Sequence, residues 1–161
     1  MFNLKAEFYL KIIFLFSFIA LISAFFIEYI LGHQPCNLCL IERIPYGLSI
    51  MIIMAIFLIR KNQKFLVMLL ILTFIFSFAI SFYHFGIEQG FFQESSVCGL
   101  KSSTEIVTKE DLLKQLSEKT ISCKDVTFRI FGLSLTSINI VISLLFIITL
   151  LKIFKKYEKN K

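Results

Sequence analysis

Four stretches of this sequence contain no charged residue, and each is close to the length that crosses a membrane. They are Ile12 to Ile27, Ile44 to Ile59, Phe65 to Ile87 and Ile130 to Leu151. A helix rises ~1.5 Å per residue and a bilayer core is ~30 Å thick, so about 20 apolar residues make one crossing. The chain is 57% hydrophobic and 17% charged, which leaves too few polar residues to cover a soluble domain of this size. No stretch alternates with a period of two, so the pattern excludes a transmembrane barrel.

We therefore predict an all-α membrane protein, a four-transmembrane-helix bundle that forms a single integral-membrane domain over residues 1–161. With polar residues allowed at the helix ends, the spans are about 10–31, 42–60, 65–87 and 132–151, and the longer connections are about 32–41 and 88–131.

The second of these connections has a helical pattern of its own. Thr108 followed by Lys109, Glu110 and Asp111 resembles a capping box. The leucines that follow lie on one face of a helix. We expect a short amphipathic helix here, which rests either on the membrane interface or in solvent.

Basic residues are distributed unevenly around the four spans. They gather in the turn between the second and third spans and in the C-terminal tail, at Arg60, Lys61, Lys64, Lys152, Lys155, Lys156, Lys159 and Lys161. By the positive-inside rule, both termini and that turn are cytoplasmic, and the two longer connections lie outside. The formal net charge of +6 is thus a topology signal, and without tryptophan or aromatic-basic clusters it does not indicate nucleic-acid binding.

All four cysteines, Cys36, Cys39, Cys98 and Cys123, lie in the two connections predicted to be outside. Thiols outside the cytoplasm persist as disulfides. Cys36 and Cys39 form a C-x-x-C, a spacing that lets two sulfurs bond or separate with little backbone movement and that is typical of thiol-disulfide exchange. Arg43 lies one helical turn after Cys39 and favours a thiolate there. Pro45 lacks the N–H that a helix uses, so we expect it to kink the helix or delay its start.

Two other interpretations of the cysteines stay open on spacing alone. A zinc site usually has four ligands, but Cys98 and Cys123 form no second C-x-x-C, and His33 and His84 are isolated histidines. We therefore expect no metal site. A Cys98–Cys123 bridge would contribute roughly 3.5 kcal/mol by the chain-entropy model, so a purely structural role is also adequate.

The order of these features resembles the family of the disulfide bond formation protein DsbB. The resemblance lies in the motif that opens the second span, in residues at the end of the third and in residues at the start of the fourth. These are Pro35-Cys36-Asn37-Leu38-Cys39-Leu40-Ile41-Glu42-Arg43, then Tyr83-His84 with Gly86, Glu88 and Gly90, then Phe131-Gly132-Leu133-Ser134 with Asn139. The chain departs from relatives with tryptophan belts, because it has no tryptophan.

This resemblance implies a quinone-dependent protein-disulfide oxidoreductase of the bacterial inner membrane. Such an enzyme re-oxidises a DsbA-like periplasmic thiol oxidase of the thioredoxin fold and passes the electrons to ubiquinone or menaquinone. It is a multi-pass protein with cytoplasmic termini and periplasmic cysteine loops. Its expected partners are that oxidase, lipid and quinone, with no nucleic acid, and we expect a monomer.

The resemblance also assigns roles to residues. It implies two redox-active disulfides, Cys36–Cys39 and Cys98–Cys123. Cys98 is attacked by the reduced partner, Cys123 then exchanges with Cys36, and Cys39 is left as the thiolate beside the quinone. Arg43 would stabilise that thiolate and the reduced quinone. His84 is a further candidate quinone ligand, with a packed interfacial histidine as the alternative, and Glu42 is expected to anchor the helix end.

Three alternative functions remain. The first is a disulfide oxidase that serves one dedicated partner (DsbI-like), and the second is a non-catalytic membrane scaffold with two structural disulfides. The third is an oxidoreductase of the vitamin K epoxide reductase type, in which the C-x-x-C would be expected late in the chain rather than at the second span.

Overall fold

Four long helices make up almost all of the part of the chain that the structure describes. The structure is a computed structural model, and it describes residues 4–59, 62–93, 123, 129–130 and 133–159. The helices are α1 (Leu4–Tyr29), α2 (Asn37–Leu58), α3 (Gln63–Glu88) and α5 (Leu135–Lys159). All four are long and apolar enough to cross a membrane, which confirms the predicted all-α, four-helix membrane bundle. The amphipathic helix expected after Thr108 lies outside the described residues.

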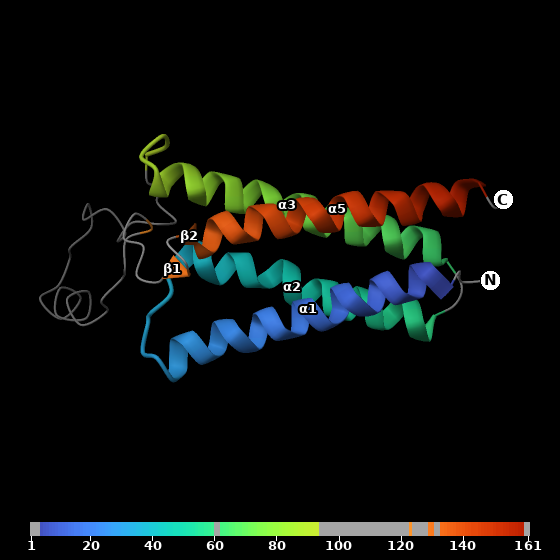
Figure 1. The fold of residues 1–161 in the computed structure, drawn as a ribbon, viewed down its shortest axis with the longest axis horizontal. Helices are drawn as coiled ribbons and strands as arrows, with labels where there is room; N and C mark the ends of the chain where they lie inside the picture. The colour runs from blue at the N-terminus through green and yellow to red at the C-terminus, as the bar shows by residue number, and fades with distance from the viewer. Residues whose placement is uncertain (1–3, 60–61, 94–122, 124–128, 131–132, 160–161) are drawn as a thin grey trace, which may run out of the picture.

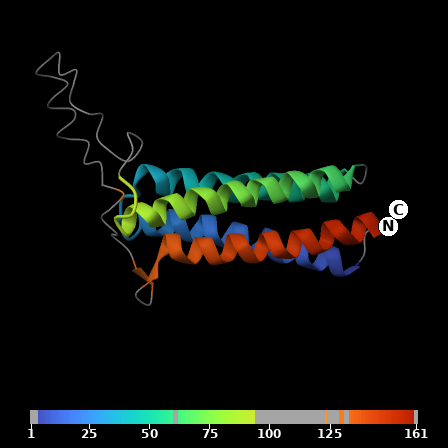
Figure 2. The ribbon, with the colours of Figure 1, turned by 90° about the horizontal axis from the view of Figure 1, so that it is seen from above.

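The four helices lie side by side along the long axis of the molecule (Figures 1 and 2). α3 packs against both α2 and α5, whereas α1 packs mainly on α2 and only lightly on α5. The start of α1, the end of α5 and the junction of α2 with α3 share one end of the bundle, and the start of α2 lies at the other (Figure 1). We refer to the end with the C-x-x-C as the cysteine end.

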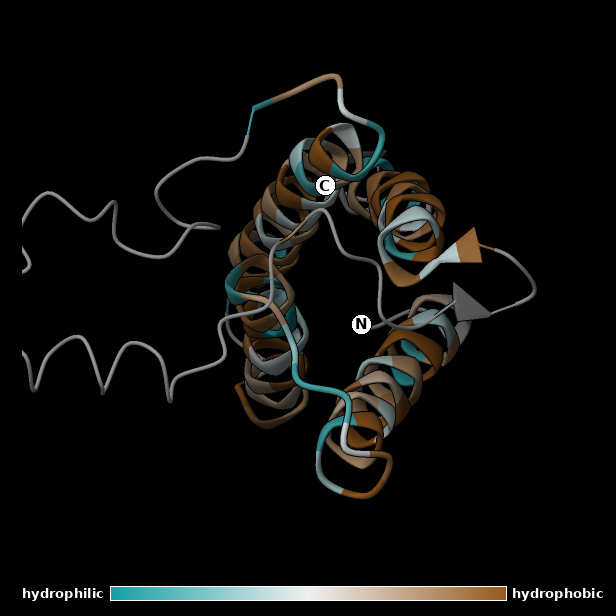
Figure 3. Cartoon of the chain, turned by 90° about the vertical axis from the view of Figure 1, so that its left-hand side faces the viewer, coloured by the Kyte–Doolittle hydropathy of each residue, from teal (hydrophilic) through white to brown (hydrophobic). Residues whose placement is uncertain are grey.

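Apolar side chains cover the outside of the bundle as well as its centre. Figure 3, which looks along the bundle from the cysteine end, shows hydrophobic residues around the helices. Large exposed side chains occur on every helix, among them Phe18, Met51, Phe76 and Leu145. A soluble monomer rarely exposes such a continuous apolar surface, so this surface is the one that faces lipid.

α2 begins earlier than the predicted second span. Its first residue is Asn37, and the Cys36 sulfur caps it by accepting a hydrogen bond from the Cys39 backbone N–H at 3.3 Å. Pro45 is buried inside the helix, so the expectation that it delays the helix start is wrong. An interior proline removes its own N–H from the ladder and crowds the carbonyl four residues before it, and here the helix nevertheless extends from Asn37 through Pro45 to Leu58.

α5 also has a feature that the sequence pattern did not indicate. Two short strands, β1 (Arg129–Ile130) and β2 (Leu133–Ser134), pair antiparallel immediately before it. The Ser134 hydroxyl oxygen then accepts from the Ser137 backbone N–H at 3.3 Å, which is the geometry of a helix N-cap. The helix therefore begins at Leu135, three residues after the start predicted for the fourth span.

A glycine is required where the chain turns out of α3. A Cβ atom on Gly86 would lie 2.1 Å from the Phe92 ring, which folds back over the helix end and stacks on Tyr83 with ring centroids 5.7 Å apart. Gly90 ends the helix with a φ of +78°, a conformation that glycine adopts without strain. This turn holds the end of α3 close to the start of α2.

Small polar residues line the inside of the bundle below the cysteine end. Ser49 donates to Ser17 at 3.0 Å, and Ser143 donates to Ser77 at 3.1 Å. All four serines are fully buried. In a membrane, such residues allow close helix approach and satisfy one another. They fix the lateral positions of the helices that carry the site.

Phe74 provides a test of this packing. It is fully buried and lies edge-on to Phe146 and Tyr46, with ring centroids 5.0 and 6.4 Å away. Phe74→Ala removes these contacts and leaves a cavity, and such a change at a buried phenylalanine lowers the free energy of unfolding by about 3–5 kcal/mol. Denaturation in mixed detergent micelles measures it. Phe76→Ala on the lipid-facing side of the same helix should change stability little, and equal losses for both variants would contradict this packing.

Candidate functional site

Two free thiols lie together where α2 begins. The Cys36 and Cys39 sulfurs are 2.7 Å apart, and neither residue is in a disulfide. Cys36 is buried and Cys39 is half-buried. Because Cys36 is the N-cap and Cys39 lies in the first turn, both sulfurs also lie near the positive end of the helix dipole. The local sequence therefore places a reduced C-x-x-C in an environment that favours negative charge.

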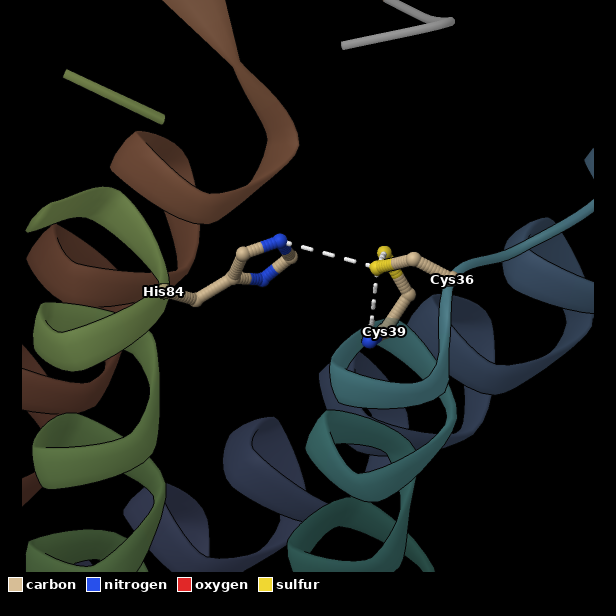
Figure 4. Close-up of side chains that lie close together, drawn as sticks. All are labelled: Cys36, Cys39 and His84. Atoms are coloured by element: carbon tan, nitrogen blue, oxygen red, sulfur yellow. Dashed lines mark hydrogen bonds between the residues drawn. The ribbon is translucent and has the colours of Figure 1, made fainter. Parts of the chain in front are cut away.

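His84 reaches this pair from α3 (Figure 4). Its Nε2 atom lies 3.6 Å from the Cys36 sulfur, and its Nδ1 atom lies 2.9 Å from Glu42 Oε1. The side chain is buried. The sequence singled out His84 as a candidate quinone ligand at the same membrane depth, and the structure places it directly against Cys36.

Glu42 links the histidine to α5. One of its oxygens is bonded to His84, and the other accepts from the Asn139 amide at 3.2 Å. Asn139 donates to Ser81 at 2.7 Å and accepts from the Tyr46 hydroxyl. Glu42 was expected to anchor the helix end, yet in the fold it lies between the thiol pair and the polar interior.

Glu88 and Thr136 complete the surroundings of His84. The Thr136 hydroxyl donates to Glu88 Oε1 at 2.7 Å and lies 3.4 Å from His84 Nδ1, while Glu88 Oε1 lies 3.9 Å from Nε2. Sequence reasoning assigned no role to Glu42, Asn139, Thr136 or Glu88 in this network. Charged and amide groups in or beside apolar spans are energetically costly unless they pair with one another or have a functional role. Their positions in the sequence could therefore have indicated this network.

Arg43 points to a different neighbour. It forms an ion pair with Glu28 of α1, and its guanidinium lies over the Phe25 ring at 5.3 Å from the centroid. Both side chains of the ion pair are mostly buried. Arg43 was predicted to act beside Cys39, and the structure brings the two residues to the wall of one cavity while it ties Arg43 to α1.

This cavity lies between α1, α2 and α5, where α1 and α5 pack lightly. Its volume is about 280 Å³. Most of its wall is apolar, and its polar side is formed chiefly by Cys39, Glu42, Arg43, Tyr46 and Asn139. Small-molecule sites have this composition, with a few polar groups set in an apolar wall. His33 lines the cavity, whereas His84 is not among its lining residues.

Cys123 lies near the thiol pair. It is buried and packs in one cluster with Cys36, Leu38 and Ile87. Cys123 is disulfide-bonded, while Cys36 and Cys39 are free. Cys98 lies outside the described residues. The predicted pairings Cys36–Cys39 and Cys98–Cys123 remain predictions.

The environment of Cys36, which precedes the membrane-spanning part of α2, lowers the pKa of its thiol to about 5. The largest cause is the hydrogen bond that Cys39 donates to its sulfur. Burial raises the pKa, and the contact with His84 lowers it. Cys36 is therefore a thiolate at neutral pH when the pair is reduced, and a thiolate is the form that attacks disulfides.

The fold and the site together define a class of protein, namely a multi-pass membrane protein with a reactive thiol pair at one end of a helix bundle. The model of the family described as disulfide bond formation protein DsbB matches residues 6–153. The chain belongs to this family, which confirms the resemblance seen in the sequence.

One relative is the uncharacterized protein RP370 of Rickettsia prowazekii (strain Madrid E). It is 32% identical over 147 residues, which cover 90% of this chain and 86% of that protein. No solved structure matches the chain. Proteins of the DsbB family are membrane disulfide oxidoreductases that in general re-oxidise DsbA and pass electrons to quinone.

The lowered pKa of Cys36 predicts a pH profile. In the reduced protein, the thiolate absorption that is lost in Cys36→Ser should appear with a midpoint near pH 5, because the thiolate is favoured above that value. Cys39→Ala and His84→Ala each remove a group that lowers the pKa, so both should move the midpoint upward, toward the ordinary value of 9.0. Ultraviolet titration measures this. A midpoint that is the same in all three proteins would show that these neighbours do not stabilise the thiolate.

Proposed function

We propose that this protein re-oxidises a DsbA-like periplasmic thiol oxidase and delivers the electrons to membrane quinone, which sustains disulfide formation in secreted proteins. One observation carries the proposal. The Cys36–Cys39 pair joins two surroundings, since both cysteines pack in or against the cluster of the disulfide-bonded Cys123, and Cys39 also lines an apolar cavity. Such a pair can receive electrons from one side and release them on the other.

The first half of the cycle is disulfide exchange. A thiolate of the reduced partner attacks Cys98 in the Cys98–Cys123 disulfide, which forms a mixed disulfide and frees Cys123 as a thiolate. Cys123 attacks Cys36 in the Cys36–Cys39 disulfide and frees Cys39. The partner's second thiol then resolves the mixed disulfide and Cys98 displaces Cys36 from Cys123. The partner leaves oxidised, and both electrons remain on Cys36 and Cys39.

The second half regenerates the Cys36–Cys39 disulfide. In the described state Cys36 and Cys39 are free and Cys123 is disulfide-bonded, which is the electron distribution that precedes this step. Two electrons leave through Cys39, the cysteine on the cavity wall. His84 Nε2 is placed to donate a hydrogen bond to the Cys36 thiolate, and Glu42 on Nδ1 holds the ring in that orientation.

The cavity fits a quinone head group in its composition. A quinone, when bound, supplies an acceptor for two electrons and two protons. Cys39 and Arg43 lie on the wall, and Arg43 would favour negative charge that develops there. His84 would act through Cys36 rather than as a cavity ligand. Ubiquinone and menaquinone share the quinone ring that this cavity would hold.

The potential of the partner supports the choice of acceptor. Oxidants of the DsbA type have a reduction potential of about −120 mV. A glutathione-like pool has a reduction potential of about −200 mV, so it cannot re-oxidise them. The acceptor must therefore be more oxidising, and a lipid-soluble one requires a membrane protein with a site open to the bilayer. The cavity between α1 and α5 meets this requirement.

The same proposal includes location and orientation. The protein would lie in the bacterial inner membrane as a monomer, with both termini cytoplasmic and the cysteine end periplasmic. Lys64, Lys152, Lys155 and Lys156 lie toward the opposite end of the bundle from the C-x-x-C, which is the distribution that the positive-inside rule requires.

The role of Cys39 is tested by Cys39→Ser. Purified variant with a reduced thioredoxin-fold partner should reduce quinone only at the background rate, because electrons would have no exit to the cavity. The control is a single stoichiometric exchange of the partner with Cys98–Cys123, which the variant should retain and which shows that it is folded. Quinone turnover equal to that of the parent protein would reject the mechanism.

The partner and the orientation are tested together by Cys123→Ala. This variant leaves Cys98 as a free thiol, which can attack the disulfide of an oxidised partner and form a mixed disulfide with it. It also lacks Cys123, the internal nucleophile that could displace the partner from Cys98, so the mixed disulfide should accumulate when the partner is supplied in its oxidised form. A soluble partner added to spheroplasts should be captured, whereas inside-out vesicles should capture none. Capture only in inside-out vesicles would reverse the proposed orientation, and no capture in either would reject Cys98 as the entry point. Capture of a single protein from a periplasmic extract that lacks DsbA would identify a dedicated-partner enzyme.

A further inference from the structure

Three potential metal ligands converge at the cysteine end. The sulfurs of Cys36 and Cys39 and a ring nitrogen of His84 all lie within 4.8 Å of one another. The residues come from the N-terminus of α2 and from α3, and their placement is shown in Figure 4. The sequence spacing supplied two of these ligands, and only the fold supplies the histidine.

The distances suit a tetrahedral ion. Zinc bonds of about 2.3 Å to sulfur and about 2.0 Å to nitrogen place those two atoms roughly 3.5 Å apart. Cys36 Sγ and His84 Nε2 are 3.6 Å apart. The two sulfurs, now 2.7 Å apart, would need to separate by about 1 Å to occupy two corners of the tetrahedron.

The surroundings of His84 are those of a metal-bound histidine. Glu42 lies 2.9 Å from Nδ1, so the carboxylate would hold a proton on that nitrogen, and a bound metal would replace the proton on Nε2, which lies 3.6 Å from Cys36 Sγ. A carboxylate on the far nitrogen is the usual outer partner of a zinc-bound imidazole. Two thiolates would neutralise the divalent charge in this buried position. The three side chains supply three of the four corners, and Cys39 also lies on the cavity wall.

We propose that the reduced protein binds a thiophilic divalent cation of the zinc class through Cys36, Cys39 and His84, and that the bound ion blocks re-oxidation of the thiol pair. The cation binds the Cys36 thiolate, displaces the thiol proton of Cys39 and the proton of His84 Nε2, and forms two metal–sulfur bonds and one metal–nitrogen bond, with no change of oxidation state. A Cys36–Cys39 disulfide cannot form these bonds, so only the reduced protein binds. The site thus makes the oxidase sensitive to thiophilic metals during turnover, and its existence does not depend on the proposed electron transfer to quinone.

Cobalt(II) is a direct probe of such a site. Full-length protein with Cys98→Ala and Cys123→Ala retains only the thiol pair in question. After reduction and removal of the reductant, cobalt should bind one to one and give thiolate-to-cobalt charge-transfer bands and the intense visible bands of tetrahedral coordination. Added zinc should abolish these bands. The same protein with Cys36 and Cys39 oxidised should give none, and absence of bands in the reduced protein would overturn the proposal.

Variants of His84 and His33 distinguish a histidine that binds the metal from one that only lies nearby. His84→Ala should weaken cobalt binding at least about tenfold, and Glu42→Gln, which keeps the shape of the side chain, should weaken it about 10- to 100-fold. His33→Ala is the matched control and should bind as the parent does, with helix content checked by circular dichroism. Equal affinity in parent, His84→Ala and Glu42→Gln, or a loss specific to His33→Ala, would overturn the assigned ligands.

Activity provides a separate readout. Zinc should inhibit oxidation of the reduced partner by the unmodified protein, and a chelator should restore the rate. Quinone turnover that zinc leaves unchanged would overturn the blocking role. Cobalt bands in a protein that never reduces quinone would support the metal site and reject the proposed function, so the two ideas fail independently.

Discussion

The contact between His84 and the polar groups around it is the interaction on which the cysteine end of the bundle depends. Polar groups inside a membrane must satisfy one another, because lipid offers no hydrogen-bond partner. His84 on α3 meets this requirement by contact with Glu42 on α2 and Thr136 on α5. These contacts draw three helices together at one depth. The same contacts bring the ring of His84 against Cys36 and so set the environment of the thiol pair.

The fold gives the two cysteines of the C-x-x-C unequal surroundings. Cys36 caps α2, is buried, and shares a cluster with Cys123. Cys39 lies one turn further on and forms part of the wall of a cavity that exists because α1 packs closely on α2 and only lightly on α5. Arg43, which also lies on the cavity wall, forms an ion pair with Glu28 of α1. The two sulfurs therefore share one cluster, but only Cys39 lies on the cavity wall.

Much of the fold could be predicted from the sequence, because a membrane span is encoded locally. An uncharged apolar stretch of about 20 residues has few stable alternatives to a transmembrane helix. The helix ends were harder to place. α2 begins at Asn37 because the Cys36 sulfur caps it, and α5 begins after a short antiparallel pair of strands. Those features depend on individual hydrogen bonds that hydropathy does not report.

The sequence by itself determined the four helices and the C-x-x-C at the start of the second one with Arg43 one turn beyond it, since each is a matter of composition or short spacing. Only the tertiary structure decided that His84 faces Cys36, that Glu42 joins His84 to Asn139 instead of anchoring a helix end, and that Arg43 pairs with Glu28. These contacts join residues on different helices. Their formation depends on how the helices rotate and pack, and burial of polar groups away from lipid favours arrangements in which these groups bond to one another.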